Sequence, residues 1–190
     1  FTALQIAAVQ KQYPDKFCLL AESENKFVPD WYAAQGVDLD RLLLLQSLGT
    51  MEDYFDAVID QTKTEQLVYV VVDSVSAMTP REELEAGKGD KVKDRGMNDV
   101  QVAADAKKIQ KFIKMTTDLF GRTETACDLI MHVRTQGIGG TMTWDGFPGG
   151  HHVKHLASQI LHAARLSKSK GAWETEKVHV DGQTYEVPKS

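Results

Sequence analysis

The segment 67–72, with the sequence LVYVVV, constrains the fold of this chain more than any other part of it. It is an unbroken run of apolar and mainly β-branched residues between polar neighbours, which is typical of a strand buried on both faces of a parallel sheet. The acidic residue Asp73 follows the run directly. The pattern therefore predicts a central strand that brings a carboxylate to one edge of its sheet.

Weaker strand and helix patterns alternate along the rest of the chain, which is typical of an α/β fold with a mainly parallel sheet flanked by helices. Thr50 and Asp53 have the spacing of a capping box, and Gly36 is expected to end a short helix. The segment 178–187 predicts a C-terminal β-hairpin around Asp181-Gly182, and 158–166 fits either a helix or a strand. The expected helices cover 1–12, 29–35, 50–62 and 109–120, and the further strands 17–21, 42–45 and 128–133.

The composition is that of a globular protein, and 190 residues suffice for one domain, which we expect to cover 1–190. The net charge of −5 argues against a globally basic nucleic-acid coat but allows a local basic groove. Cys18 and Cys127 have no cysteine partner nearby and are expected to be buried thiols of a reducing compartment. No apolar run approaches the roughly 20 residues that span a membrane. We expect a cytoplasmic protein.

Asp73 is the residue whose position points most clearly to a role in ligand binding or catalysis. An acid at the carboxyl end of a buried parallel strand lies at the edge where such sheets bind ligands. There it could hold Mg²⁺ through water beside a phosphate chain. The alternative is a solvated aspartate that caps the following turn with the help of Ser74.

Two further groups are expected at the same edge. Glu22-Ser23-Glu24 follows the strand 17–21, and a carboxylate there could orient an attacking water, or these could be solvated loop acids. His132 is placed by the pattern at the end of the strand 128–133, directly before a glycine-rich segment. A lone histidine in such a place is often structural.

Two long polar segments interrupt the alternation, and loops of this length inside a domain are usually functional or disordered. The first, 79–100, is rich in charge and contains three glycines. The second, 135–150, contains six glycines with apolar residues among them.

Taken in order, these landmarks resemble the RecA-type strand-exchange recombinases over nearly the whole chain. VVVDSVSAMTPREELE (70–85) is similar to the family's Walker B strand and the segment after it. CLLAESENKFVPDWYAAQGVD (18–38) is similar to the segment with the catalytic glutamate, and its spacing matches the bacterial and the phage (UvsX-like) branches, leaning towards phage. GGHHVKHLAS (149–158) resembles the double glycine, helix and strand after the second DNA-binding loop. The resemblance implies a RecA-like P-loop NTPase core.

The resemblance also implies roles at a site for ATP and Mg²⁺. Glu24 corresponds to the base that activates water, and Asp73, followed by Ser74, to the acid on the magnesium side. Trp31 falls where the family has an aromatic that stacks on adenine. His132 falls on the polar residue that senses the γ-phosphate, where the phage branch also has histidine.

The two polar segments correspond to the family's DNA-binding loops. Cations would contact phosphates, and apolar or aromatic side chains would stack on or wedge between bases. Mobile solvated loops are the alternative. Lys189 resembles the lysine that reaches a neighbour's ATP across the filament interface. The implied DNA-binding residues are Lys88, Lys91, Lys93, Arg95 and Met97 in the first loop and Arg134, Ile138, Met142, Trp144 and Phe147 in the second.

Some features depart from the family. The phosphate-loop motif is not present, and the chain opens at Phe1 inside a helical pattern, so we expect a fragment that is inactive alone. Met131 stands where the family usually has asparagine. The three histidines 151, 152 and 155 could suggest zinc, but no carboxylate has suitable spacing, and we expect them near DNA phosphates or the γ-phosphate relay.

The resemblance favours an ATP-dependent recombinase that forms a helical filament on single-stranded DNA, pairs it with double-stranded DNA and exchanges strands. Two alternatives stay open. The first is another RecA-fold DNA-dependent ATPase of a helicase or repair type. The second is a DNA-binding module with a deficient nucleotide site.

Overall fold

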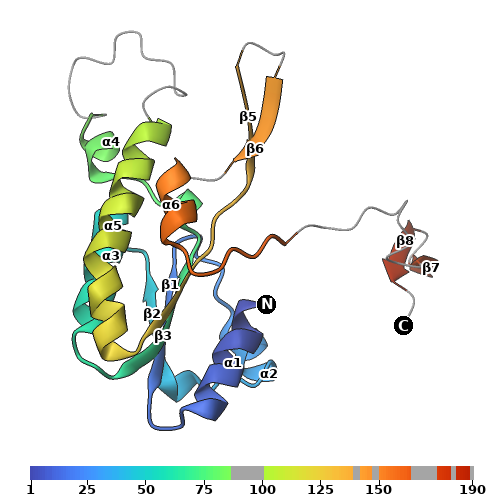
Figure 1. The fold of residues 1–190 in the computed structure, drawn as a ribbon. Helices are drawn as coiled ribbons and strands as arrows, with labels where there is room; N and C mark the ends of the chain where they lie inside the picture. Colours follow the sequence, from blue (N-terminus) through green and yellow to red (C-terminus); the bar gives the residue numbers. More distant parts are fainter. Residues whose placement is uncertain (87–100, 139–141, 147–149, 164–174, 181–182, 189–190) are drawn as a thin grey trace. The chain divides into compact units, whose positions relative to one another are not determined.

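The computed structural model describes residues 1–86, 101–138, 142–146, 150–163, 175–180 and 183–188, with the backbone alone at some of them. The chain divides into two compact units, Phe1–Leu156 and Ala157–Ser190. The first unit contains the helices and the main sheet labelled in Figure 1. In the described part of the chain, no helix combines the length and the apolar character needed to cross a bilayer.

The main sheet of the first unit has four parallel strands in the order β2-β1-β3-β4. The central pair is β1 (Phe17–Glu22) and β3 (Leu67–Asp73), with β2 (Leu42–Gln46) and β4 (Ala126–Leu129) outside them. Five residues of β3 are buried, because neighbouring strands and helices on both faces cover them. The prediction of a central buried strand in a parallel α/β sheet is confirmed.

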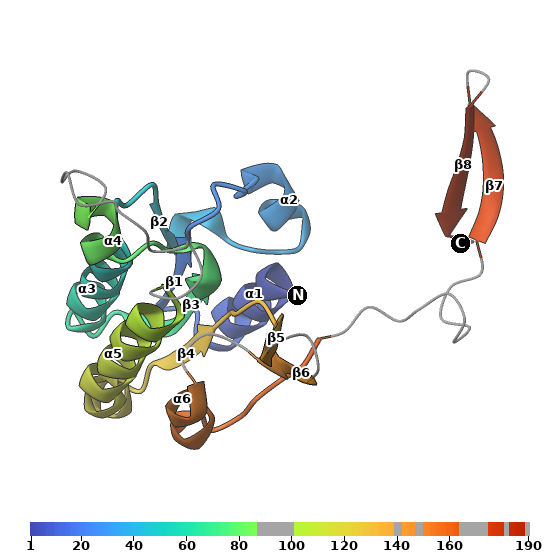
Figure 2. The same ribbon diagram turned by 90° about the horizontal axis from the view of Figure 1, so that it is seen from above.

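Helices cover both faces of this sheet, as Figure 2 shows. The alternation of side chains along β1 and β3 divides them between two cores. Leu19 and Val70 pack with α3 (Met51–Thr62) and α5 (Gln101–Thr123). Leu20 and Val71 pack with α1 (Thr2–Gln12) and α2 (Pro29–Ala34). The helices predicted at these places are confirmed.

The predicted signals at helix ends are also confirmed. The Thr50 hydroxyl accepts the N–H of Asp53 at 3.1 Å, and the Asp53 carboxylate accepts the N–H of Thr50 at 2.9 Å. This is a complete capping box at the start of α3. Gly36, just after α2, has φ +90°, which a residue with a Cβ rarely adopts. A further short helix, η1, covers Leu39–Arg41.

The predicted strand 128–133 is wrong in its bounds. The strand β4 begins at Ala126 and ends at Leu129, where its pairing with β3 ends. Ile130 still donates its N–H to the carbonyl oxygen of Val72 and accepts from the N–H of Val75, both at 2.9 Å. These bonds hold Ile130 beside the end of β3, but the strand itself ends at Leu129, so His132 follows it by three residues instead of ending it.

The two segments predicted as long loops contain regular structure where they are described. After η2 (Val75–Ala77), the first holds α4 (Arg81–Ala86), and residues 87–100 lie outside the described residues. The second pairs β5 (Arg134–Ile138) with the antiparallel β6 (Met142–Gly146) before α6 (Gly150–Leu156). The prediction of an uninterrupted loop is therefore wrong for the second segment. Backbone hydrogen bonds pair its two strands, and glycine can form such bonds as well as other residues.

The second unit contains a two-stranded antiparallel sheet of β7 (Thr175–Val180) and β8 (Gln183–Pro188). The residues 181–182, at which the sequence predicts the turn, lie outside the described residues. The pattern of 158–166 fits either a helix or a strand, and the described residues 158–163 form neither.

Candidate functional site

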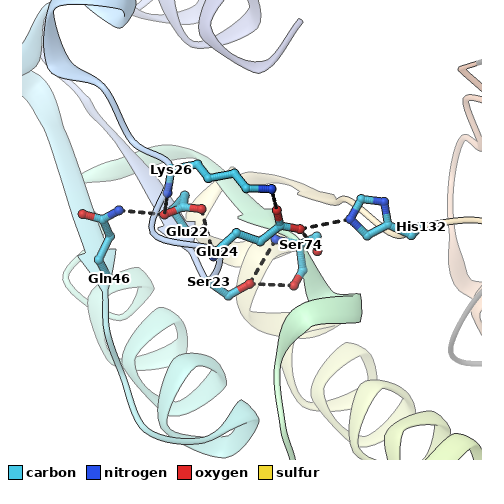
Figure 3. A network of polar contacts seen from close by, with 7 residues as sticks. All are labelled: Glu22, Ser23, Glu24, Lys26, Gln46, Ser74 and His132. Atoms are coloured by element: carbon cyan, nitrogen blue, oxygen red, sulfur yellow. Dashed lines mark hydrogen bonds and ion pairs between the residues drawn. The ribbon is translucent and has the colours of Figure 1, made fainter. Parts of the chain in front are cut away.

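The candidate site lies at the carboxyl edge of β1 and β3. Glu22 and Asp73, the last residues of these strands, are paired in register. Beyond them, Ser23 donates its N–H to the carbonyl oxygen of Asp73 and its hydroxyl to the carbonyl oxygen of Ser74, both at 2.8 Å. These bonds hold the two loops together, and Figure 3 shows the polar side chains that gather there.

Glu24 is at the centre of this group. Its Oε1 accepts the Ser74 hydroxyl at 3.1 Å and lies 3.1 Å from Nε2 of His132, while its Oε2 forms an ion pair with Lys26. The contacts with Lys26, His132 and Ser74 lower the pKa of Glu24 to about 2, and Lys26 contributes most. The side chain is therefore an ionised carboxylate, which can accept a hydrogen bond from a water molecule.

Asp73 has a different electrostatic environment. Its side chain is half-buried, and burial, followed by the charges of Glu24 and Glu22, raises its pKa above the usual value. A bound divalent cation would stabilise an ionised carboxylate in such surroundings, so the donor chemistry fits magnesium. No group of three or more His, Cys, Asp or Glu side chains among the described residues could hold a metal ion. Asp73 would therefore need water and phosphate oxygens as further ligands.

His132 reaches this group from the segment after β4. Its backbone N–H donates to the hydroxyl of Ser76 at 2.9 Å, which fixes the chain beside the end of β3. Its side chain is exposed, and its ring points to Glu24 in Figure 3. The structure thus brings together Glu24, Asp73, Ser74 and His132, four residues that the sequence singles out.

Sequence reasoning missed the supporting part of the site. From the sequence, Glu22 is only a candidate for orienting water, whereas in the structure its carboxylate is buried and accepts hydrogen bonds from Gln46 and from two backbone N–H groups. Neither Lys26 nor Gln46 is singled out from the sequence. The paired ends of β1 and β2 could have suggested Gln46, but nothing in the local sequence indicates Lys26.

Two more residues singled out from the sequence lie apart from these contacts. Trp31 is on α2, about half exposed, with its ring edge-on to that of Tyr32 at 5.2 Å between centroids. It is accessible to a planar ligand. Met131, where the RecA-type pattern has asparagine, packs partly buried against the core shared by β3, α3 and α5.

The predicted DNA-contacting residues remain a prediction. Arg134 and Ile138 are the first and last residues of β5, opposite Gly146 and Met142 of β6, and Trp144 is opposite Gln136. For these the structure describes the backbone alone. The predicted residues outside the described part of the chain are Lys88, Lys91, Lys93, Arg95, Met97, Phe147 and Lys189.

We expect the substitution Lys26→Met to raise the pKa of Glu24. The folded-state pKa of about 2 lies below the usual 4.5, so the contacts of Glu24 stabilise the fold above pH 4.5, and this contribution is lost as the pH falls towards 2. Loss of Lys26 removes the largest cause, while His132 and Ser74 remain. A ¹³C NMR titration of the Glu24 carboxyl measures the shift.

The matched control is Lys63→Met. Lys63 is an exposed lysine paired with Asp60 on α3. This variant removes the same charge from the chain and should leave the titration of Glu24 where it is. Equal titration curves for Glu24 in both variants would contradict the assigned ion pair.

A family model and individual proteins of known sequence both point to one family. A family model described as the RecA N-terminal domain matches residues 1–184. Protein RecA of Rippkaea orientalis is 30% identical over 175 residues, which cover 90% of this chain and 46% of that protein. Protein RecA of Mesomycoplasma hyopneumoniae strain 7448 is 29% identical over 166 residues, or 86% and 45% of the two chains. The chain spans less than half the length of these relatives.

Proposed function

This chain belongs to the RecA family, and we propose that the protein is an ATP-dependent recombinase that forms a helical filament on single-stranded DNA. It pairs this strand with homologous double-stranded DNA and exchanges strands. In this proposal residues 1–190 form the ATPase core, and hydrolysis of ATP releases the DNA. The spacing of residues 18–38 favours an origin in a phage, and this stays a prediction.

The observation that carries the proposal is the set of contacts around Glu24. An ionised carboxylate next to the loop after β3, and in contact with a histidine, can accept a hydrogen bond from a water molecule and orient it for attack. Asp73 lies in register at the neighbouring strand end, where a metal-side acid is needed. In the proposal, Glu24 activates water beside the terminal phosphate of ATP.

The other proposed roles concern the bound nucleotide. Asp73 holds Mg²⁺ through water, with Ser74 beside it, and the cation would offset the charge of the phosphates. Trp31 stacks on adenine, and Lys189 reaches the ATP of a neighbouring subunit. The phosphate-loop motif does not occur in these 190 residues. The proposal therefore requires one elsewhere in the gene product, and sequencing the gene around this segment tests that requirement.

His132 is the proposed link between nucleotide and DNA. It contacts Glu24, and β5 begins only two residues later at Arg134. A change in the Glu24 contact on nucleotide binding would therefore act directly on the segment proposed to bind DNA. The proposed DNA contacts are the cations and the apolar residues of 79–100 and 134–150, as named above.

The proposal predicts that single-stranded DNA stimulates ATP hydrolysis. The complete gene product should turn over ATP with magnesium several-fold faster when single-stranded DNA is added, because His132, which contacts Glu24, adjoins the segment proposed to bind DNA. A coupled phosphate-release assay with and without DNA measures this. An equal rate of hydrolysis with and without DNA would instead favour another RecA-fold ATPase. No hydrolysis, with DNA binding retained, would favour a DNA-binding module.

A further inference from the structure

The buried carboxylate of Glu22 is attached to the turn that carries Glu24. Only 5% of Glu22 is exposed. Its Oε1 accepts the backbone N–H of Glu24 at 2.9 Å, and its Oε2 accepts the N–H of Lys26 at 3.0 Å and Nε2 of Gln46 at 2.6 Å. Both oxygens are therefore engaged, which offsets the cost of burying the charge.

The turn is also attached to neighbouring elements. Gln46, the last residue of β2, is in register with Glu22. The hydroxyl of Ser47 donates to Oδ1 of Asn25 at 3.0 Å, and the hydroxyl of Tyr54 on α3 donates to the carbonyl oxygen of Glu22 at 3.1 Å. The turn 23–26 is therefore fastened to the end of β2 and to α3. Figure 3 shows Gln46 on the side of Glu22 away from Glu24.

We propose that Glu22 and Gln46 are positioning residues, which hold the turn so that Glu24 meets the attacking water in a productive geometry. This inference rests on the proposed function, because it assigns the residues an effect that passes through Glu24. A general base must lie within hydrogen-bond reach of the proton that it takes, so a loosened turn lowers turnover. The residues proposed to contact the nucleotide, Asp73, Trp31 and Lys189, lie outside this turn, so we expect nucleotide binding to be unchanged.

The hydrogen-bond pattern explains why a carboxylate is required. The two backbone N–H groups donate to different oxygens of Glu22. A glutamine at this position would have one oxygen and one NH₂ group, so either orientation of its amide would set a donor against a donor. Glu22→Gln should therefore disturb the turn although it conserves volume.

The test uses Gln46→Met in the complete gene product, because methionine is similar in length and lacks the donor. We expect kcat of the DNA-stimulated hydrolysis to fall about 10-fold, with KM for ATP and the affinity for single-stranded DNA unchanged. The same change in a Glu24→Gln background should lower turnover no further, because the effect passes through Glu24. The control Gln12→Met, at the exposed end of α1, should behave as wild type.

A second measurement is amide hydrogen exchange across 22–27. Faster exchange there in Gln46→Met than in Gln12→Met supports the role in holding the turn, and equal exchange overturns it, whatever the enzyme's activity. If the wild type hydrolyses ATP and Gln46→Met has the same kcat, the positioning role is refuted while the proposed function stands. If the wild type shows no DNA-stimulated hydrolysis, the proposed function fails, and exchange alone decides whether Gln46 orders the turn.

Discussion

Glu24→Gln should abolish ATP turnover while ATP still binds. Glutamine keeps the size of the side chain, and its oxygen can still accept the hydroxyl of Ser74. Its amide cannot take a proton from water, so the contribution of a general base, typically about 100-fold or more in rate, is lost. Steady-state hydrolysis with single-stranded DNA, together with equilibrium binding of a fluorescent ATP analogue, measures the two effects separately.

The control for this prediction is Glu65→Gln. Glu65 is exposed and precedes β3, so it lies at the opposite edge of the sheet from Glu24. The variant makes the same chemical change and should hydrolyse ATP at the wild-type rate. Turnover of Glu24→Gln equal to that of Glu65→Gln would refute the role proposed for Glu24, and parallel loss of ATP binding would indicate a structural role instead.

The central part of the fold could be predicted because its signals are local. The run 67–72 is apolar without interruption, and the capping box of α3 needs only residues three positions apart. The bounds of β4 could not be predicted in this way. Asp128 lies inside this strand, where its carboxylate accepts the Tyr69 hydroxyl at 2.6 Å and Nε2 of Gln5 at 3.2 Å. Those partners are 59 and 123 residues away, so no local pattern shows that the strand begins two residues before this acid, at which the prediction starts it.

In the candidate site, too, some residues could be predicted from local signals and others could not. The strand pattern places Asp73 at the edge where parallel strands end, whereas only the resemblance to the RecA-type recombinases singles out Glu24 from its neighbour Glu22. The supporting contacts of Glu22 could not be predicted, because they depend on which strand lies beside β1. The turn 23–26 meets Gln46 only because β2 pairs with β1 in a register that places both strand ends together. That register is a property of the folded sheet.

Phe112→Ala should be the most destabilising of the substitutions proposed here. Phe112, on α5, is 2% exposed, and its ring is stacked on that of Phe55 of α3 at 4.2 Å between centroids. Truncating a buried phenylalanine costs about 3–5 kcal/mol through lost burial and the remaining cavity, and the lost ring pair is part of this cost. The better helix propensity of alanine offsets only about 0.5 kcal/mol. Urea unfolding of the complete gene product, followed by circular dichroism, measures the change.

A comparison on the same helix separates packing from helix propensity. Met115 is 53% exposed, so Met115→Ala changes a side chain of α5 without opening a cavity and should alter the free energy of unfolding by less than about 0.5 kcal/mol. Phe112→Leu should fall between the two, because leucine fills part of the space. Since a whole domain is stable by only about 5–15 kcal/mol, the loss at Phe112 would remove a large fraction of it. Equal effects of Phe112→Ala and Met115→Ala would mean that α5 does not pack on α3 through this ring.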